Sequence, residues 1–179
     1  MEKAQLREES LKKRSIISNK PFKDLQIFSK FIHLPEFESA KSLLIYINID
    51  DEAETRRLID FAINRNKSVY IPFIEEQEIG LFQGWEKLNE KKVNDKRFLE
   101  PQEKVKDVVI DCAIVPIVGF DKKLNRLGYG KGWYDRFLKK NKQCFKIGVA
   151  YDEQLIGKIP VEKNDVSMNM IVTPNNLYK

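Results

Sequence analysis

The chain has 179 residues, of which 42% are apolar, 11% aromatic and 33% charged. A chain of this length can bury one sizeable core but is too short for two domains of typical size, so we expect residues 1–179 to form a single domain. The net charge of +5 favours anionic ligands such as phosphates, polycarboxylates or nucleic acid, and charge alone does not choose among them.

The N-terminal part of the sequence predicts two helices. Residues 3–18 are rich in Leu, Lys, Arg and Glu, and residues 22–33 form an amphipathic segment that Pro35 is expected to stop. No apolar run resembling a signal peptide opens the chain, and no window approaches the length of a membrane span. We therefore expect a cytoplasmic protein that does not contact a membrane.

The pattern then changes to short apolar runs that alternate with helices. Residues 42–47 form a continuous apolar run, which is typical of a strand covered on both faces, and residues 53–64 carry an apolar helical stripe. Further strands are expected at 68–72, 112–116, 146–150 and 170–172, weaker ones at 79–82 and 105–110 around a polar middle, and a helix at 133–140.

This alternation predicts an α/β fold: a single open, mostly parallel sheet flanked by helices on both faces, as in a Rossmann-like three-layer sandwich. Ligands of such sheets normally lie beyond the carboxyl ends of the strands. The candidate site should therefore be built from the loops that follow Ile47, Pro72, Pro116 and Tyr151.

The cysteines and the histidine offer no reactive cluster. Cys112 and Cys144 lie far apart within apolar stretches and without a companion at metal-ligand spacing, so we expect buried thiols. His33, the only histidine, lies on an amphipathic segment and is expected to be structural. A Ser–His–Asp or Cys–His catalytic unit is therefore not expected.

Residues 118–136 carry the strongest chemical signal. Three glycines alternate along this stretch, at positions 128, 130 and 132. A backbone without Cβ atoms can approach an anion closely, and the helix that follows adds unsatisfied N–H groups. Arg126 and Lys131 add full positive charges, and Asp135 is placed to hold a divalent cation that bridges phosphates. Glycine spacing alone is equally typical of a flexible turn, with Asp135 and Arg136 as a surface pair.

The residues that flank the glycines resemble the signature of the 5-formyltetrahydrofolate cyclo-ligase family. The matching segments are Phe120-Asp121, Asn125-Arg126-Leu127-Gly128, Gly130-Lys131-Gly132 and Tyr134-Asp135-Arg136. The likeness continues, in the right order, through residues 3–7, 52–55, 69–72, 100–101, 111–116, 160–165 and Thr173. It therefore covers nearly the whole chain.

The resemblance implies an enzyme that uses ATP and Mg²⁺ to close 5-formyltetrahydrofolate into 5,10-methenyltetrahydrofolate. The formyl oxygen would attack the γ-phosphate, and N10 of the folate would then displace the phosphate, with release of ADP and phosphate. Such chemistry depends mainly on positioning and charge neutralisation, so no covalent enzyme nucleophile is expected. The implied partner is a small-molecule folate, with or without a polyglutamate tail, and the protein is expected to be a monomer without a nucleic-acid partner.

The resemblance also assigns roles by matching position. It implies that Arg126 and Lys131 are catalytic and that Asp135 and Asp165 bind magnesium. The implied ATP-binding residues are Lys3, Ala4, Gln5, Leu6, Arg7, Arg126, Leu127, Gly128, Tyr129, Gly130, Lys131, Gly132, Trp133 and Tyr134. The implied folate-binding residues are Ile49, Glu54, Tyr129, Gly130, Lys131, Gly132 and Trp133. Among them, the Glu54 carboxylate would accept hydrogen bonds from the pterin ring N–H groups.

The first predicted helix agrees with these assignments. At 100° per residue, Lys3, Arg7 and Arg14 lie within about 40° of one another on one face. Without the resemblance, such a basic stripe would be interpreted as a solvated face. Two positions depart from the family pattern: Trp133 stands where the family usually has Tyr, and Asn169 stands where many members have Asp.

Three alternatives compete with this interpretation. A nucleic-acid-binding module would explain aromatic residues beside basic ones, but it predicts a continuous basic face, whereas acidic residues are interspersed throughout. A sugar-phosphate isomerase or acyltransferase of similar architecture would not explain why Arg126, the glycines, Lys131 and Asp135 occur together. A family member without catalysis would serve only as a nucleotide- or nucleic-acid-binding module.

Overall fold

The computed structural model describes residues 2–179, in which seven strands form one sheet of order β11-β10-β9-β6-β1-β2-β3. The strands are β1 (Ser42–Ile45), β2 (Ser68–Pro72), β3 (Ile79–Leu81), β6 (Cys112–Pro116), β9 (Phe145–Val149), β10 (Met170–Val172) and β11 (Leu177–Tyr178). Strands β10, β9, β6, β1 and β2 pair in parallel, whereas the edge strands β3 and β11 pair antiparallel. The predicted open, mostly parallel sheet is confirmed.

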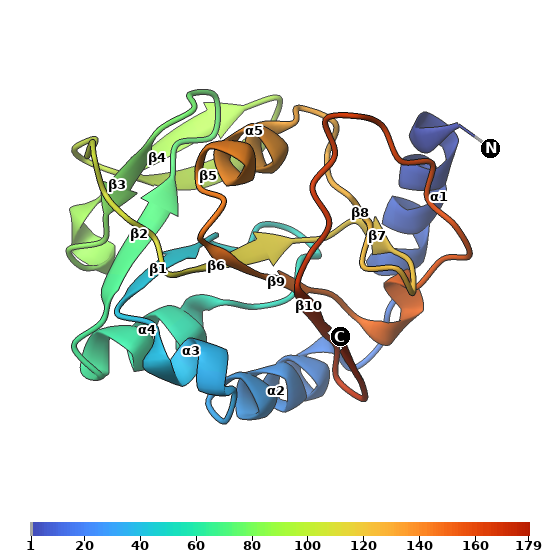
Figure 1. The fold of residues 1–179 in the computed structure, drawn as a ribbon, viewed down its shortest axis with the longest axis horizontal. Helices are drawn as coiled ribbons and strands as arrows, with labels where there is room; N and C mark the ends of the chain where they lie inside the picture. The colour runs from blue at the N-terminus through green and yellow to red at the C-terminus, as the bar shows by residue number, and fades with distance from the viewer. Residues whose placement is uncertain (1) are drawn as a thin grey trace.

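Helices cover both faces of this sheet (Figure 1). Helices α2 (Lys20–Phe31), α3 (Pro35–Ser39) and α4 (Arg56–Asn64) cover one face, and α5 (Trp133–Lys140) lies on the other. Neighbouring residues of β1 pack on opposite faces of the sheet. Leu43 lies in the apolar cluster that contains Phe31 and Leu58. Leu44 lies in the cluster that contains Phe137. Because both faces are buried, the central strands are continuous apolar runs, as predicted.

The remaining elements lie around the sheet. Helix α1 (Lys3–Ser15) packs beside a small hairpin of β7 (Gly119–Phe120) and β8 (Arg126–Leu127), and near the 3₁₀ helix η2 (Asp152–Gln154) (Figure 1). A second hairpin, β4 (Leu88–Val93) with β5 (Lys96–Pro101), follows the 3₁₀ helix η1 (Trp85–Lys87). No helix within residues 2–179 has both the length and the apolar character needed to cross a lipid bilayer.

Several predicted boundaries are wrong for local reasons. Helix α1 ends at Ser15 and α4 begins at Arg56, so both are shorter than expected. Pro35 starts a short helix, because proline fits the first helical position, where its missing N–H has no partner to lose. Residues 105–110 are not a strand: only Val105 forms a bridge, to Ile79, and Asp107 has a positive φ of 58° that breaks extended structure.

Both cysteines are free and buried, as predicted. Burial raises the pKa of the Cys144 thiol to about 12, so the reactive thiolate is disfavoured. The Nδ1 atom of His33 lies 2.7 Å from the carbonyl oxygen of Ser29 at the end of α2. These positions agree with structural roles for all three side chains.

Candidate active site

A cavity of about 1220 Å³ opens beyond the carboxyl ends of the central strands. Ile47 after β1, Pro72 at the end of β2 and Pro116 at the end of β6 all line it. Tyr151 itself is fully buried, and its hydroxyl donates a hydrogen bond to Asp24 at 2.8 Å. The loop that follows Tyr151 nevertheless reaches the cavity through Pro160, Glu162, Asn164 and Asp165, so all four loops expected to build the site contribute to it. A drug-sized ligand typically fills about 300–1,000 Å³, so this cavity has room for more than one small molecule.

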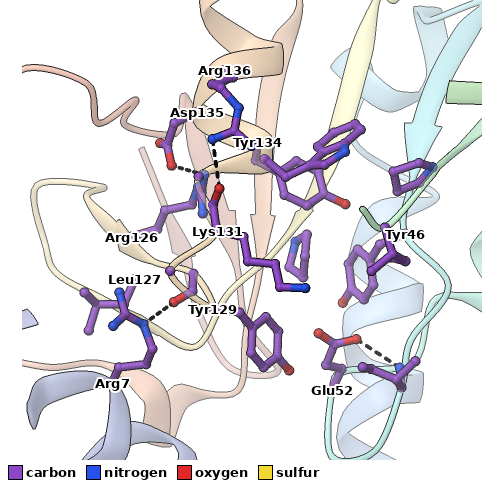
Figure 2. Close-up of a pocket in the computed structure, with 18 of the residues that line it drawn as sticks. Arg7, Tyr46, Glu52, Arg126, Leu127, Tyr129, Lys131, Tyr134, Asp135 and Arg136 are labelled. Carbon is purple, nitrogen blue, oxygen red and sulfur yellow. Dashed lines mark hydrogen bonds and ion pairs between the residues drawn. The ribbon is translucent and has the colours of Figure 1, made fainter. Parts of the chain in front are cut away.

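The glycine loop between β8 and α5 forms one side of the cavity (Figure 2). Gly130 has a φ of 91° and Gly132, which caps α5, has a φ of 63°. Residues other than glycine rarely adopt these φ angles, so the path of the backbone favours glycine at both positions. Helix α1 holds the loop, because Arg7 donates a hydrogen bond from Nε to the carbonyl of Gly128 at 2.7 Å.

Two cations of this loop are available for an anion. The side chain of Arg126 is only 4% exposed, and its Nη2 lies 3.1 Å from Asp135 Oδ2, yet its Nε has no hydrogen-bond partner within residues 2–179. Figure 2 shows the side chain of Lys131 extending into the cavity, where its ammonium makes no hydrogen bond or ion pair with the described chain. Lys131 thus carries an uncompensated charge and Arg126 has free donor capacity, and positive groups of this kind in a concave site attract phosphate.

Two carboxylates from distant parts of the sequence meet beside the loop. Asp135 accepts a hydrogen bond from the Val166 N–H at 3.0 Å, and this contact brings the neighbouring Asp165 to the same wall of the cavity. Asp165 in turn lies 2.5 Å from the ammonium of Lys3. Burial alone would raise the pKa of Asp165, but the contacts with Lys3 and the Glu162 N–H outweigh it and lower that pKa, so the carboxylate stays ionised.

This donor set fits a magnesium ion that arrives with a nucleotide. Within residues 2–179 no three acidic, histidine or cysteine side chains gather as a complete metal cage. Mg²⁺ typically needs only one or two protein carboxylates when phosphate oxygens and water complete its octahedron. Asp135 and Asp165 supply two hard oxygen ligands, and each is already neutralised by a cation, Arg126 and Lys3, that a phosphate can attract in its place.

The opposite side of the cavity is built by the loop after β1, and its carboxylate is Glu52 (Figure 2). Glu52 is 8% exposed and accepts a hydrogen bond from the Ile49 N–H at 2.9 Å. Burial raises the pKa of its carboxyl above the ordinary value, although the Ile49 N–H and the nearby Arg14 and Tyr129 partly oppose this. A buried carboxylate facing a cavity is a strong acceptor for ligand N–H groups.

Most of the predicted site residues line this one cavity. They are Lys3, Ala4, Arg7, Ile49, Asp135, Asp165 and all nine residues from Arg126 to Tyr134. Three predicted residues do not: Gln5 caps the start of α1, Leu6 packs against a buried apolar cluster, and Glu54 forms an ion pair with Arg57 at 3.0 Å. Of the two acidic residues that follow β1, Glu52 rather than Glu54 therefore lines the cavity.

The β4–β5 hairpin forms a wall that the sequence reading missed. Phe98 and Leu99 line the cavity, and Lys96 bridges two other walls: its ammonium lies 2.8 Å from Asp50 and 5.2 Å from the centre of the Tyr129 ring. The available signal was the pair Asn94-Asp95, since this turn type needs two residues with positive φ and Asn and Asp tolerate it. Apolar walls of this kind suit a flat aromatic ligand.

Trp133 combines packing with a cavity-facing position. Its ring stacks on Phe137 at a centroid distance of 5.2 Å, and its Nε1 donates a hydrogen bond to the Glu76 carbonyl at 2.5 Å. The indole thus fills the core on one side of α5 and lines the cavity on the other. Its partner fixes the ring, so Trp133 can offer a rigid apolar surface without a hydroxyl.

Comparison with known proteins gives one consistent result. A family model described as the 5-formyltetrahydrofolate cyclo-ligase family matches residues 1–174. The chain is 33% identical over 174 residues to a probable 5-formyltetrahydrofolate cyclo-ligase of Schizosaccharomyces pombe, covering 87% of this chain and 85% of the relative. It is 32% identical over 163 residues to the 5-formyltetrahydrofolate cyclo-ligase of Escherichia coli K12, covering 86% and 89%.

A solved structure agrees with these relatives. The 5,10-methenyltetrahydrofolate synthetase of Aquifex aeolicus superposes with a TM-score of 0.83 at 31% identity, and the match covers 100% of this chain and 93% of that one. The match therefore includes the sheet, the glycine loop and the segment that carries Asp165.

Proposed function

Because the chain belongs to the 5-formyltetrahydrofolate cyclo-ligase family, it is a ligase that acts on folate in one-carbon metabolism, and we propose that it consumes ATP with Mg²⁺ to close 5-formyltetrahydrofolate into 5,10-methenyltetrahydrofolate. One observation carries the proposal. A cationic glycine loop with two carboxylates and a buried acidic loop with apolar walls face each other across a single cavity. The first arrangement suits a triphosphate and the second suits a pterin.

The proposed reaction has two steps. The formyl oxygen attacks the γ-phosphorus of ATP, the bond to the β-phosphate oxygen breaks, and ADP leaves. The formyl carbon, now bearing a phosphate leaving group, is attacked by N10 of the same folate. N10 loses its proton, phosphate departs, and the five-membered ring closes. Both steps need alignment of reacting atoms and neutralisation of phosphate charge more than a reactive side chain.

The side chains divide this work between the two sides of the cavity. Lys131 and Arg126 neutralise the transferred phosphoryl group, because one is uncompensated in the cavity and the other is buried with free donor capacity. Arg7 fixes the loop through Gly128. When bound, Mg²⁺ would neutralise phosphate charge as a Lewis acid, and Asp135 and Asp165 would hold it.

On the folate side, Glu52 accepts hydrogen bonds from the pterin N–H groups, and the apolar walls exclude water from the ring. Ile49, Tyr129 and Trp133 contribute to those walls. We further propose that residues 1–179 act as one catalytic domain and as a monomer, because a single chain supplies every wall of the cavity, from Lys3 to Asp165.

The proposal is tested by following the absorbance of the methenyl product. Purified protein is expected to produce it from 5-formyltetrahydrofolate only when ATP and Mg²⁺ are both present, and to release ADP in equal amount. Omission of either component, or addition of EDTA, should abolish the signal. Product formation without nucleotide would contradict the phosphoryl-transfer step, and no product under any condition would contradict the activity itself.

A further inference from the structure

Arg14 is a buried charge that the proposed mechanism does not use. It lies in the last turn of α1, is 2% exposed and does not line the cavity. Within residues 2–179 it forms no ion pair, and its Nε has no hydrogen-bond partner. Burying a guanidinium without a paired carboxylate is costly, so the fold tolerates a penalty at this position.

The partners of Arg14 lie directly behind the folate side of the cavity. Its Nη2 donates a hydrogen bond to the hydroxyl of Tyr129 at 2.6 Å, and its Nη1 lies 3.4 Å from the carbonyl oxygen of Ile117. Figure 2 shows the Tyr129 hydroxyl beside the Glu52 carboxylate, and each of these two groups affects the pKa of the other. Arg14, Tyr129 and Glu52 thus form a row of polar groups that leads from the protein interior to the cavity.

The chemistry of Arg14, Tyr129 and Glu52 determines which group donates a proton to which. Arginine has only donors, so the Tyr129 oxygen must accept from Arg14. A hydroxyl has a single proton, which is then left for the carboxylate of Glu52. Arg14 thus occupies one lone pair of the Tyr129 oxygen, and the Tyr129 proton points to Glu52. The Glu52 carboxylate receives this hydroxyl donor on the side away from the cavity, and its other oxygen lone pairs remain available for a ligand.

We propose that Arg14 is a positioning residue for the folate, acting through Tyr129 to hold Glu52 ionised and oriented toward the pterin. The inference rests on the proposed function, since it takes Glu52 as the group that receives the pterin. It adds a residue that touches no substrate. It also explains why the enzyme keeps a buried cation on the helix whose outer end, at Lys3 and Arg7, reaches the other side of the same cavity.

The surroundings of Glu52 determine the expected pH dependence. The charged or titratable groups that face it are Arg14 from α1, Tyr46 after β1, Lys96 from β5, Tyr129 from the glycine loop and Tyr134 from α5. Burial raises the pKa of Glu52, whereas Arg14 and Lys96 oppose that rise. Folate affinity should therefore increase as pH rises through this pKa, and loss of Arg14 should move the increase to higher pH.

The test compares Arg14→Met with Lys13→Met, which removes a charge from an exposed position in the same helical turn. Binding of 5-formyltetrahydrofolate without ATP is measured by calorimetry between about pH 5 and 8. Arg14→Met should weaken folate binding roughly tenfold near neutral pH, with ATP affinity nearly unchanged. The acid limb of the profile, which is the pH range where folate affinity falls as pH is lowered, should move upward by roughly half a pH unit or more. Lys13→Met should match the wild type.

Equal folate affinity and equal pH profiles for a folded Arg14→Met and Lys13→Met would overturn the proposal. If Arg14→Met does not fold, two milder variants decide. Arg14→Lys keeps the charge and should leave the acid limb at the wild-type pH. Tyr129→Phe removes the hydroxyl that links Arg14 to Glu52 and should shift the acid limb to higher pH. An unshifted limb in Tyr129→Phe would also overturn the proposal. A wild-type protein that neither binds nor converts the folate would instead contradict the proposed function.

Discussion

Replacement of Lys131 by alanine should lower kcat by about 100-fold or more, because removal of one preorganised donor to developing charge typically costs that much. The Lys131 ammonium extends into the cavity without a partner in the described chain, so its charge is free for the transferred phosphoryl group. Steady-state kinetics at saturating ATP and folate measure the loss. The folate KM should change little, since Glu52 and the apolar walls remain.

The matched control for Lys131 is Lys140, an exposed lysine in the last turn of the helix that follows the loop and outside the cavity. Lys140→Ala removes the same charge from the same region and should retain nearly full turnover. If both variants were equally active, Lys131 would not be the phosphoryl-stabilising residue, and the triphosphate would have to be placed elsewhere.

Substitution of Glu52 by glutamine should raise the KM for 5-formyltetrahydrofolate by roughly 10- to 100-fold, the usual range for losing a hydrogen bond to a charged group. Glutamine keeps the shape of the side chain but accepts fewer hydrogen bonds and carries no charge. The KM for ATP should stay within about threefold, because the glycine loop is untouched. Calorimetric binding of the folate alone separates this effect from turnover.

Glu54→Gln is the natural comparison for Glu52→Gln. The two carboxylates are two residues apart, but Glu54 pairs with Arg57 outside the cavity, whereas Glu52 is buried in its wall. The Glu54 variant should keep near-normal folate KM. The reverse pattern, with Glu54→Gln impaired and Glu52→Gln normal, would show that the pterin binds on a different side of the loop.

The sequence predicted well those features that repeat or cluster locally. The apolar run from residue 42 required a strand buried on both faces, and the glycines required a loop that approaches a ligand. Both lie where expected, as do Asp135 and Asp165, which come together although they are thirty residues apart. That pairing was reached through the family resemblance, because spacing along the chain does not bring them together.

The choice between Glu52 and Glu54 could not be made from the sequence alone. Both follow β1 in a polar loop, and the loop path decides which one enters the cavity. Asp50 adopts a positive φ of 47°, and the Glu52 N–H then donates to the Ile49 carbonyl at 3.0 Å, a tight turn that directs Glu52 inward. An aspartate such as Asp50 signals that a turn can form here, but it does not show which of the two glutamates the turn directs into the cavity.

The β4–β5 hairpin was missed for a related reason. Its strands contain many Lys and Glu residues and are only partly buried, and they lack the apolar alternation by which half-buried strands are recognised. Burial of Phe98 and Leu99 is only partial, and their function is to face a cavity that a single sequence does not reveal. Walls of a ligand site are therefore harder to predict than strands of a core.

The central claim is that residues 126–135 bind the terminal phosphates of ATP, and a crystal structure with a non-hydrolysable ATP analogue and Mg²⁺ tests it most directly. The account predicts the γ-phosphate within hydrogen-bonding distance of Lys131 and of the loop N–H groups, with the metal between the phosphates and the carboxylates of Asp135 and Asp165. A triphosphate bound away from this loop, with Lys131 still facing an empty cavity, would contradict it.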